Sequence, residues 1–361
     1  MTDPAAIGNT QLTVISADPM CASARLSSLD EGITPTANYF IRNHFGVPNI
    51  DVSTWSISIW GEVDNPVMVR YDELLEMPSR EMKTLLECAG NSRSTMQPPA
   101  EGVAWDHGAV GTARWRGVSV STILNQASVR AIAKNVLFEG ADYGRERNAP
   151  GALAPRELSY AMSLPMEKVL HPDTMLVYEM NGETLPPEHG YPVRLLVPGW
   201  YGMASVKWLA NIRVLEQPFR GFHENDYYVY VAEGASDSTG QRVSTIKVKS
   251  LITSPSRGEL VPVGAHKIRG VAWSGQGPIT KVEVSTDDGV QWHEAEVERA
   301  DSPYGWQHWE YDWETGHPGH YLLRARAVDE QGNIQPSQAQ WNFRGYSVNS
   351  IHVVPVTVHD T

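Results

Sequence analysis

The sequence contains only two cysteines, Cys21 and Cys88, among its 361 residues. Two thiols cannot build the disulfide framework of a small cross-linked protein, and they do not make a zinc site unless several histidines stand at ligand spacing. The twelve histidines are scattered without an HExxH or HxH pair, and they occur in unrelated contexts such as His44, His107, His189 and His352. A disulfide framework and an all-protein zinc centre are therefore not expected.

Long apolar runs are also missing. No stretch approaches the uninterrupted apolar length that a membrane span needs, and the composition, 41% hydrophobic and 20% charged, is that of a soluble globular protein. The first twenty residues, MTDPAAIGNTQLTVISADPM, lack the basic start and apolar middle of a secretory signal. We therefore expect a protein without membrane contact that is cytoplasmic, or periplasmic if a leader was removed before the numbering begins.

Positive charge is in the minority. The chain carries 29 Lys and Arg against 42 Asp and Glu, which gives a net charge of -13. This balance argues against nucleic acid or an anionic membrane as a partner. A local basic pocket can still exist inside an acidic protein.

The length exceeds one ordinary hydrophobic core and favours two domains, with room for a third. The chain changes character near residues 233–245. Before that point, residues 55–59 alternate as a half-buried strand, and Val120, Ile123 and Leu124 recur at helical spacing after Gly117. The small, polar segment 232–240, AEGASDSTG, indicates a linker. We predict domains at residues 1–235 and 245–361.

The second domain shows no helical pattern. Residues 281–285, 309–313 and 323–327 alternate between apolar and polar side chains. Asp287-Asp288-Gly289 is a strong hairpin signal, and residues 329–333 provide a further turn. Strands at this spacing predict an all-β sandwich of immunoglobulin type, here without its inter-sheet disulfide. There is no internal repeat and no low-complexity tract.

Cys88 lies in the segment LLECAGNSR, residues 85–93, where an apolar run meets turn residues. A lone cysteine is often a small buried hydrophobe, and Cys21 fits that description. Cys88 instead stands where a strand ends and a loop begins, and Arg93 nearby favours the thiolate. Two chemistries are open: a nucleophile with His189 as its base, or a metal ligand whose partners come from a cofactor.

Several further segments follow in a characteristic order. They are residues 39–44 (YFIRNH), 87–93 (ECAGNSR), 102–105 (GVAW), 108–115 (GAVGTARW), 179–182 (EMNG), 188–194 (EHGYPVR), 206–209 (VKWL), 272–275 (AWSG) and 341–345 (WNFRG). Together they span roughly residues 38 to 352. In this order the chain closely resembles the molybdenum sulfite oxidase family, in its bacterial form without a haem domain.

The resemblance implies an α+β molybdenum-cofactor domain followed by an immunoglobulin-like domain that makes a homodimer. It implies that Cys88 is the one protein ligand to molybdenum, and a soft sulfur suits that metal. The molybdopterin would be held by a set of mostly polar residues, which by similarity are Phe40, Ile41, Arg42, Asn43, His44, Asp142, His189, Arg194, Ser205, Val206 and Lys207. Guanidinium and ammonium groups such as those of Arg194 and Lys207 suit a buried phosphate.

The resemblance also implies a small cationic substrate pocket. Its matching residues are Arg42, Arg93 and Arg344, with Trp105 as a wall and Tyr227 as a hydroxyl donor. Converging arginines repel one another, and the cost is tolerable when an anion normally lies between them. The implied reaction is two-electron oxidation of sulfite to sulfate, with His44 tuning proton release.

The electrons would pass to an external acceptor such as cytochrome c or oxygen, because no haem-binding segment precedes residue 38 and no haem is expected. Two positions depart from the family pattern. Glu101 replaces a lysine, and Ser92 stands where animal enzymes have the first of two consecutive arginines. Nitrate or sulfoxide reduction on the same scaffold is the alternative, and a non-enzymatic immunoglobulin-like scaffold protein is a more distant one.

Overall fold

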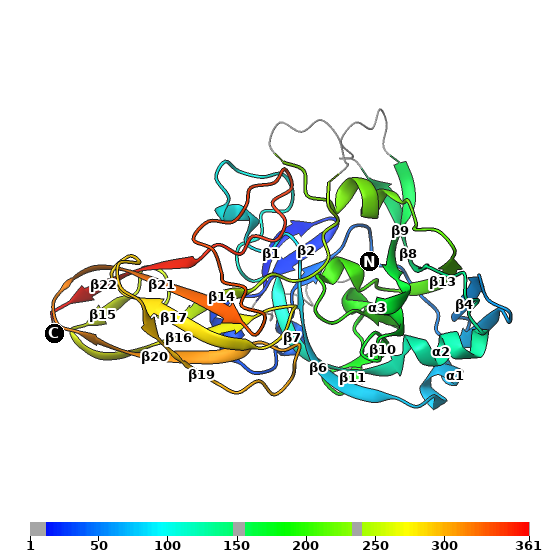
Figure 1. The fold of residues 1–361 in the computed structure, drawn as a ribbon, viewed down its shortest axis with the longest axis horizontal. Helices are drawn as coiled ribbons and strands as arrows, with labels where there is room; N and C mark the ends of the chain where they lie inside the picture. The colour runs from blue at the N-terminus through cyan, green and yellow to red at the C-terminus, as the bar shows by residue number, and fades with distance from the viewer. Residues whose placement is uncertain (1–11, 147–155, 233–239, 361) are drawn as a thin grey trace.

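The computed structural model describes residues 12–146, 156–232 and 240–360. Strands dominate, and helices are few and short. Figure 1 shows an elongated molecule, with a mixed α+β region at one end and a β-sandwich, which carries the C-terminus, at the other. The predicted fold class, an α+β domain followed by an all-β sandwich, is confirmed. No helix among the described residues is long and apolar enough to cross a membrane.

The α+β region contains three sheets. A small sheet has the order β1 (Thr13–Ala17), β2 (Met20–Ser23), β3 (Ile41–Arg42). A second has the order β11 (Glu183–Thr184), β10 (Met175–Met180), β7 (Val110–Ser119), β6 (Arg80–Glu87), with β12 (Arg194–Leu196) paired to β10. The third has the order β5 (Val67–Arg70), β4 (Ser56–Gly61), β13 (Leu209–Leu215), β8 (Asn135–Glu146), β9 (Arg156–Pro165).

The helices of this region are short. The α-helices are α1 (Tyr71–Glu76), α2 (Val120–Ala127) and α3 (Met166–Leu170). The 3-10 turns are η2 (Leu26–Asp30), η3 (Thr36–Asn38), η4 (Arg93–Thr95), η5 (Pro187–His189) and η6 (Gly202–Ala204), and η7 (His223–Tyr227) is a turn of π-helix. The predicted helical face is confirmed, because α2 buries Val120, Ile123, Leu124 and Ala127 at i, i+3, i+4 and i+7.

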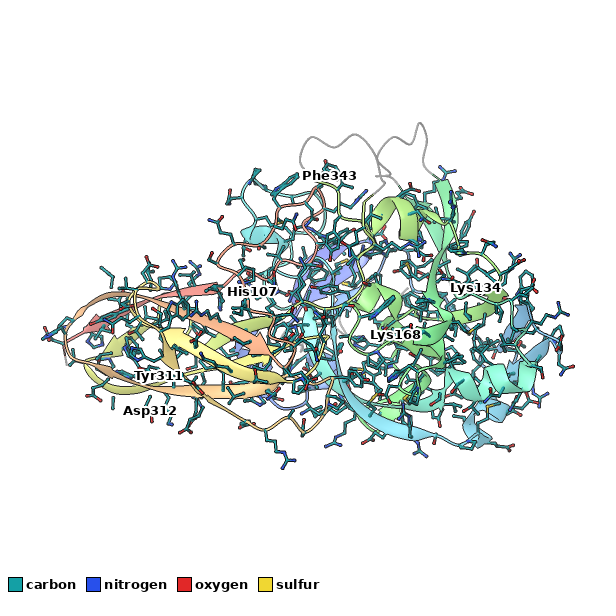
Figure 2. All side chains as sticks on the ribbon, viewed as in Figure 1. His107, Lys134, Lys168, Tyr311, Asp312 and Phe343 are labelled. Atoms are coloured by element: carbon teal, nitrogen blue, oxygen red, sulfur yellow. The ribbon has the colours of Figure 1, made fainter. Side chains whose placement is uncertain are left out.

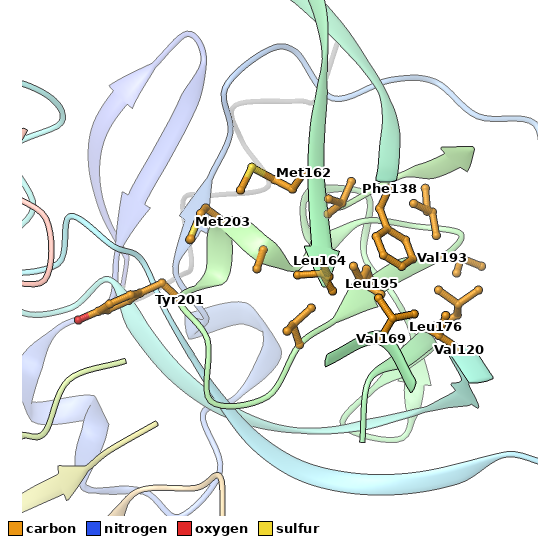
Figure 3. Packing of buried hydrophobic residues seen from close by; sticks show 14 of the residues in the cluster. Val120, Phe138, Met162, Leu164, Val169, Leu176, Val193, Leu195, Tyr201 and Met203 are labelled. Carbon is orange, nitrogen blue, oxygen red and sulfur yellow. The ribbon is translucent and has the colours of Figure 1, made fainter. Parts of the chain in front are cut away.

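The core of this region forms where β8 and β9 pack on α2, α3 and the edge of the β10 sheet. Figure 3 shows Phe138 and Leu164 from the two strands meeting Val169, Leu176 and Val120. The same cluster continues through Tyr201 and Met203 toward the cavity described below. The scaffold that positions the cavity is therefore a continuous apolar core.

The sandwich consists of two sheets. One has the order β14 (Lys249–Ser254), β16 (Gly264–Trp273), β20 (Gln307–Thr315), β19 (Glu296–Val297). The other has the order β15 (Leu260–Pro262), β22 (His352–His359), β21 (Gly319–Asp329), β17 (Ile279–Ser285), β18 (His293–Glu294). The predicted alternation is confirmed, because residues 309 and 313 of β20 and residues 323, 325 and 327 of β21 are buried in the core between them.

Both predicted turns are present. Asp288 and Gly289 have positive φ angles of 62° and 92° in the loop between β17 and β18. The amide of Asp329 donates to the carbonyl of Asn333 at 3.1 Å. Most of the predicted linker, residues 233–239, lies outside the described residues, so the boundary between residues 235 and 245 stays a prediction. The core of the first region also includes Val243, Ile246 and Leu251, so apolar packing continues across this boundary.

Candidate active site

Cys88 is the first residue after β6, as predicted. Its amide donates to the carbonyl of Ala109 at 2.9 Å, and its carbonyl accepts from the amide of Asn91 at 2.9 Å. Ser92 takes a left-handed conformation, with φ of 70°. These bonds fold residues 88–92 into a tight turn, and the Cys88 side chain, only 8% exposed, faces a cavity.

The cavity encloses about 700 Å³ of empty space, counting its open mouth. It gathers nine of the residues that the sequence predicts for the site: Phe40, Arg42, His44, Cys88, Asp142, His189, Arg194, Ser205 and Lys207. They come from segments far apart in the chain, including β3, the end of β6, the β8 bulge and the loop after β12. The tertiary fold therefore brings most of the predicted site around one cavity.

Two cations, Arg194 and Lys207, are fixed by carbonyl groups at one part of the cavity. Arg194 donates to the carbonyls of His189 at 3.0 Å and Ser205 at 3.1 Å. Lys207 donates to the carbonyl of Glu188 at 2.8 Å and to the side-chain oxygen of Asn43. Backbone carbonyls hold these side chains in place without neutralising them, so both charges are available to an anion.

The charges in the cavity are poorly balanced. Burial lowers the pKa of Lys207, with Arg194 acting in the same direction and Asp142 against it. Burial also raises the pKa of Asp142, against the charge of Lys207. Three cations, Arg42, Arg194 and Lys207, line the cavity with two carboxylates, those of Asp142 and Glu188. An anionic group such as a phosphate would restore the balance and favour the charged form of Lys207.

A second group of side chains surrounds Arg42 and His44. One guanidinium nitrogen of Arg42 lies 3.3 and 3.2 Å from the two ring nitrogens of His44. His44 Nε2 lies 2.7 Å from the hydroxyl of Tyr228, which is also hydrogen-bonded to Tyr160. The Tyr160 hydroxyl donates to the carbonyl of Met203 at 2.7 Å. This chain of contacts fixes how Arg42 enters the cavity.

Burial raises the pKa of the Cys88 thiol, while the charges of Arg42 and Arg93 act in the opposite direction. Both guanidinium groups are therefore close enough to the sulfur to act on it electrostatically. An anion held in the cavity by Arg42 would therefore lie near Cys88.

Arg93, Arg344 and Tyr227 form a separate cluster beside the cavity and are not part of its wall. Arg93 donates to the carbonyl of Arg344 at 2.6 Å and to that of Val103 at 2.7 Å. The guanidinium of Arg344 lies 4.1 Å from the centre of the Tyr227 ring. The Tyr227 ring lies 5.2 Å from that of His44, centroid to centroid, so the cluster adjoins the Arg42 group.

Three glycines enclose Arg93. A Cβ atom built on Gly90, Gly102 or Gly345 would lie within 2.3 to 2.8 Å of the Arg93 side chain. Gly102 and Gly345 also have positive φ angles of 120° and 57°. The arginine is therefore held in a slot formed by three segments of the chain, and any side chain at these positions would displace it.

The remaining predicted residues lie behind the wall. Ile41, Asn43 and Val206 alternate with wall residues, and Asn43 contacts Lys207 directly. Trp105 is fully buried and meets the Phe40 ring edge to face at 6.5 Å. Glu101 is exposed, and its amide donates to the carbonyl of Phe343 at 3.1 Å.

Sequence reasoning missed Tyr228 and Tyr160, which both line the cavity. Tyr228 follows Tyr227 directly, and only the end of the π-helical turn η7 decides which of the two faces the cavity. A π-helical turn often marks a functional site, but this one has no clear signature in the sequence. The paired tyrosines, YY at residues 227 and 228, were the only signal available.

Two observations test whether the cavity suits a molybdopterin. Within the described residues, the buried Arg194 Nε and Asn43 Nδ2 atoms have no hydrogen-bond partner, and Asn43 contacts the wall residue Lys207. Unpaired buried donors are costly, so acceptors such as phosphate or pterin oxygens fit here. In the described part of the chain no three His, Cys, Asp or Glu side chains are grouped to hold a metal. A metal at Cys88 would therefore take its other ligands from a cofactor, and the residues present fit that group.

His189 makes the stability of this region depend on pH. Burial, reinforced by Lys207 and Arg194, lowers the pKa of His189 from 6.5 to about 3. Between these pH values the unfolded chain binds more protons at His189 than the folded chain does. The contribution of neutral His189 to stability is therefore fully present above pH 6.5 and is lost as the pH falls. In this window we expect the free energy of unfolding to fall by about 1.4 kcal/mol for each unit by which the pH decreases, because of His189.

Urea unfolding measured between about pH 7 and 5 checks this expectation. The His189→Gln variant should lose that part of the pH dependence. An unchanged slope in the variant would show that His189 titrates in the folded protein as it does in the unfolded chain.

Both regions of the chain match known protein families. Residues 44–223 match the oxidoreductase molybdopterin binding domain, and residues 241–359 match the Mo-co oxidoreductase dimerisation domain. Sulfite oxidase of Gallus gallus is 34% identical over 341 residues, which cover 89% of this chain and 72% of that protein. Mitochondrial sulfite oxidase of Mus musculus is 34% identical over 98% of this chain and 66% of its own length.

The likeness extends beyond sulfite oxidases. Nitrate reductase [NADH] 1 of Arabidopsis thaliana is 34% identical over 88% of this chain, but the match covers 37% of that protein. The chain spans less than two thirds of the length of the mammalian and insect sulfite oxidases. The crystal structure of the sulfane dehydrogenase SoxCD from Paracoccus pantotrophus superposes with a TM-score of 0.81 at 29% identity, over 96% of this chain and 88% of that one.

Proposed function

Because this chain belongs to the sulfite oxidase family of molybdopterin-dependent oxidoreductases, we propose that it oxidises sulfite to sulfate. The electrons pass to an external acceptor. One observation carries the proposal above the others: the single cavity thiol, Cys88, lies within the electrostatic reach of two guanidinium groups, those of Arg42 and Arg93. A sulfur ligand beside converging cations suits a metal that acts on a small anion.

The cofactor would be held at the other set of cations. Arg194 and Lys207 would bind its phosphate, because their positions are fixed by carbonyls and their charge is not matched by Asp142. Asn43 and Arg194 would offer their unpaired donors to its polar edge. Cys88 would hold the metal through its sulfur. When bound, the molybdenum cofactor supplies the oxygen transfer and the two-electron change.

The protein's own part in the reaction is to bind and orient the anion. Arg42 enters the cavity, braced by His44 and Tyr228, and would form charge-assisted hydrogen bonds to sulfite oxygens. Arg93 and Arg344 lie behind it and would make the pocket attractive to a dianion. Tyr227, whose ring lies 5.2 Å from that of His44, would support this group from behind the cavity wall.

The overall reaction joins sulfite and water to give sulfate, two protons and two electrons. The protons must leave a cavity that is largely buried. His44 is the titratable group within the Arg42 contacts, and its bond to Tyr228 leads toward Tyr160. We assign His44 the role of accepting a proton at a ring nitrogen.

Two other substrates have a specific observation in their favour. Nitrate reductases share 34% identity over most of this chain, and the SoxCD sulfane dehydrogenase shares its fold over nearly the whole length. Steady-state assays of the molybdenum-loaded protein separate the three. Sulfite with ferricyanide or cytochrome c should be turned over, and nitrate with reduced viologen or a sulfane-sulfur compound should react at least about a hundredfold more slowly. A faster reaction with nitrate or with the sulfane-sulfur compound than with sulfite would show that sulfite is not the substrate.

A homodimer formed through residues 241–359 belongs to the same proposal, because that region matches a dimerisation domain. The electron acceptor would then dock on a surface that this interface leaves uncovered.

A further inference from the structure

A buried ion pair links the sandwich to the Cys88 turn. Lys249, the first residue of β14, lies 3.1 Å from the carboxylate of Glu87, the residue directly before Cys88. Both side chains are only 2% exposed. An ion pair this deeply buried is costly to form unless further hydrogen bonds satisfy both partners, so its surroundings are informative.

Further hydrogen bonds connect this ion pair to the Cys88 turn and to the sandwich. Lys249 also donates to the hydroxyl of Ser92 at 2.8 Å. The Glu87 carboxylate accepts from the side-chain amide of Asn91 at 3.0 Å and from the indole of Trp273 at 2.9 Å. Lys249 and Trp273 stand opposite each other on β14 and β16, so the sandwich supplies two of the three donors to Glu87.

The network continues to the junction between the two regions. The Ser92 hydroxyl lies 2.8 Å from His107 Nδ1, and the His107 ring contacts that of His352 from β22, with 4.5 Å between the ring centres and a tilt of 60° between the planes. Figure 2 shows His107 at the junction of the sandwich and the α+β region. The amide of Ser347 donates to the carbonyl of Ala89 at 2.7 Å, a further bond from the C-terminal region to this turn.

We propose that Lys249 is a positioning residue for Cys88, through which the sandwich sets the place of the cavity's sulfur. Residues on both sides of Cys88, namely Glu87, Asn91 and Ser92, belong to one network whose central cation is Lys249. Ser92 is short enough to leave room for this ammonium beside the turn. The dimerisation region therefore does more than join two copies, because it reaches into the loop that carries the sulfur.

Loss of the ammonium leaves the Glu87 carboxylate buried beside two neutral donors. An uncompensated buried charge moves toward water, and this movement displaces the end of β6 and Cys88 with it. Lys249 does not line the cavity, so its effect on an anion in the cavity is indirect. Removal of Lys249 should therefore alter the presentation of Cys88 more than the binding of substrate.

The test measures Cys88 directly, without turnover. In full-length protein free of cofactor and carrying Cys21→Ser, iodoacetamide reports the exposure of Cys88 alone. The Lys249→Met variant should be alkylated at least about tenfold faster than its parent. Lys249→Arg should stay within about threefold, and Lys249→Met combined with Glu87→Gln should recover to a similar rate, because the pair is then neutral.

A matched control separates this effect from general loosening. Lys168 is partly buried, donates to the carbonyl of Pro198 at 2.8 Å, and takes no part in the network. Lys168→Met should leave the alkylation rate unchanged. An unchanged rate in Lys249→Met, an equal rise in Lys168→Met, or no recovery in the double variant would each overturn the proposal.

A second measurement rests on the proposed function. In molybdenum-loaded protein, Lys249→Met should lower kcat for sulfite at least about tenfold while KM changes less than about threefold. A rise in KM alone would place Lys249 in substrate binding and overturn the positioning role. If the parent protein does not oxidise sulfite, the alkylation result still decides the role of Lys249, so the two failures are distinguishable.

Discussion

The Cys88→Ser variant is expected to lose sulfite turnover by at least about a thousandfold, equivalent to about 4 kcal/mol of transition-state stabilisation. Cys88 is the only cysteine that lines the cavity among the described residues. A serine hydroxyl is a hard donor with a high pKa, and it cannot replace a soft thiolate at molybdenum. The substitution removes little volume, so the midpoint of thermal unfolding should stay within about 4 °C of the parent.

Cys21→Ser is the matched control for this variant. Cys21 is also buried, on β2 opposite Arg42, and its Sγ donates weakly to the carbonyl of Asn43 at 3.8 Å. A serine can keep that bond, and Cys21 does not line the cavity, so turnover should stay within about threefold. Activity retained by Cys88→Ser, or lost equally by Cys21→Ser, would show that Cys88 is not the metal ligand.

The Arg42→Gln variant is expected to lower kcat/KM for sulfite by about two to three orders of magnitude. Arg42 is the one proposed substrate arginine that lines the cavity. Its loss removes a full charge and two or more charge-assisted hydrogen bonds to the anion, each contributing about 1.5–3 kcal/mol. Arg42→Lys should recover only part of the loss, because an ammonium cannot make the paired contacts of a guanidinium.

Arg80→Gln is the matched control for Arg42→Gln. Arg80 bonds to the carboxylate of Asp173 at 2.5 Å near the surface and is remote from the cavity wall. Steady-state kinetics should show kcat/KM within about twofold of the parent for this variant. Molybdenum content must be measured in both proteins. A fall in metal content that matches the fall in turnover for Arg42→Gln would assign Arg42 to cofactor binding in place of substrate binding.

The fold was largely predictable because its signals are local. Strand β4 and helix α2 follow from alternation and from spacing at i, i+3, i+4 and i+7. The turn at Asp288 and Gly289 follows from residues that tolerate a positive φ angle. The order of strands within each sheet did not follow, because the pairing of β13 between β4 and β8 joins segments far apart in the sequence.

The site was predictable only where a family motif carried it. Cys88, Arg194 and Lys207 have local sequence signatures, and the fold brings them to one cavity. Tyr228 had no such signature, because its direction depends on where η7 ends. The ion-pair partner of Glu87 could not be predicted from the sequence either, since Lys249 lies 162 residues further along the chain. Contacts of this kind depend on tertiary structure and leave no periodic pattern.

Ser92 departs from the family motif, and the structure gives this departure a physical role. In the sequence it is only the loss of a cation beside Arg93. In the structure its hydroxyl accepts from Lys249 and contacts His107, so the positive charge next to the turn comes from another strand. Glu101, the second departure, is exposed and does not line the cavity. Of the two, Ser92 is therefore the one with a structural consequence for Cys88.

If the cavity beside Cys88 holds a molybdenum cofactor, elemental analysis of the purified protein should detect the metal. Protein made in cells that synthesise the cofactor should contain about one molybdenum atom per chain, and Cys88→Ser made in the same way should contain much less. Protein without molybdenum under these conditions would show that the cavity does not hold the cofactor, and metal bound equally well by Cys88→Ser would show that Cys88 is not its ligand.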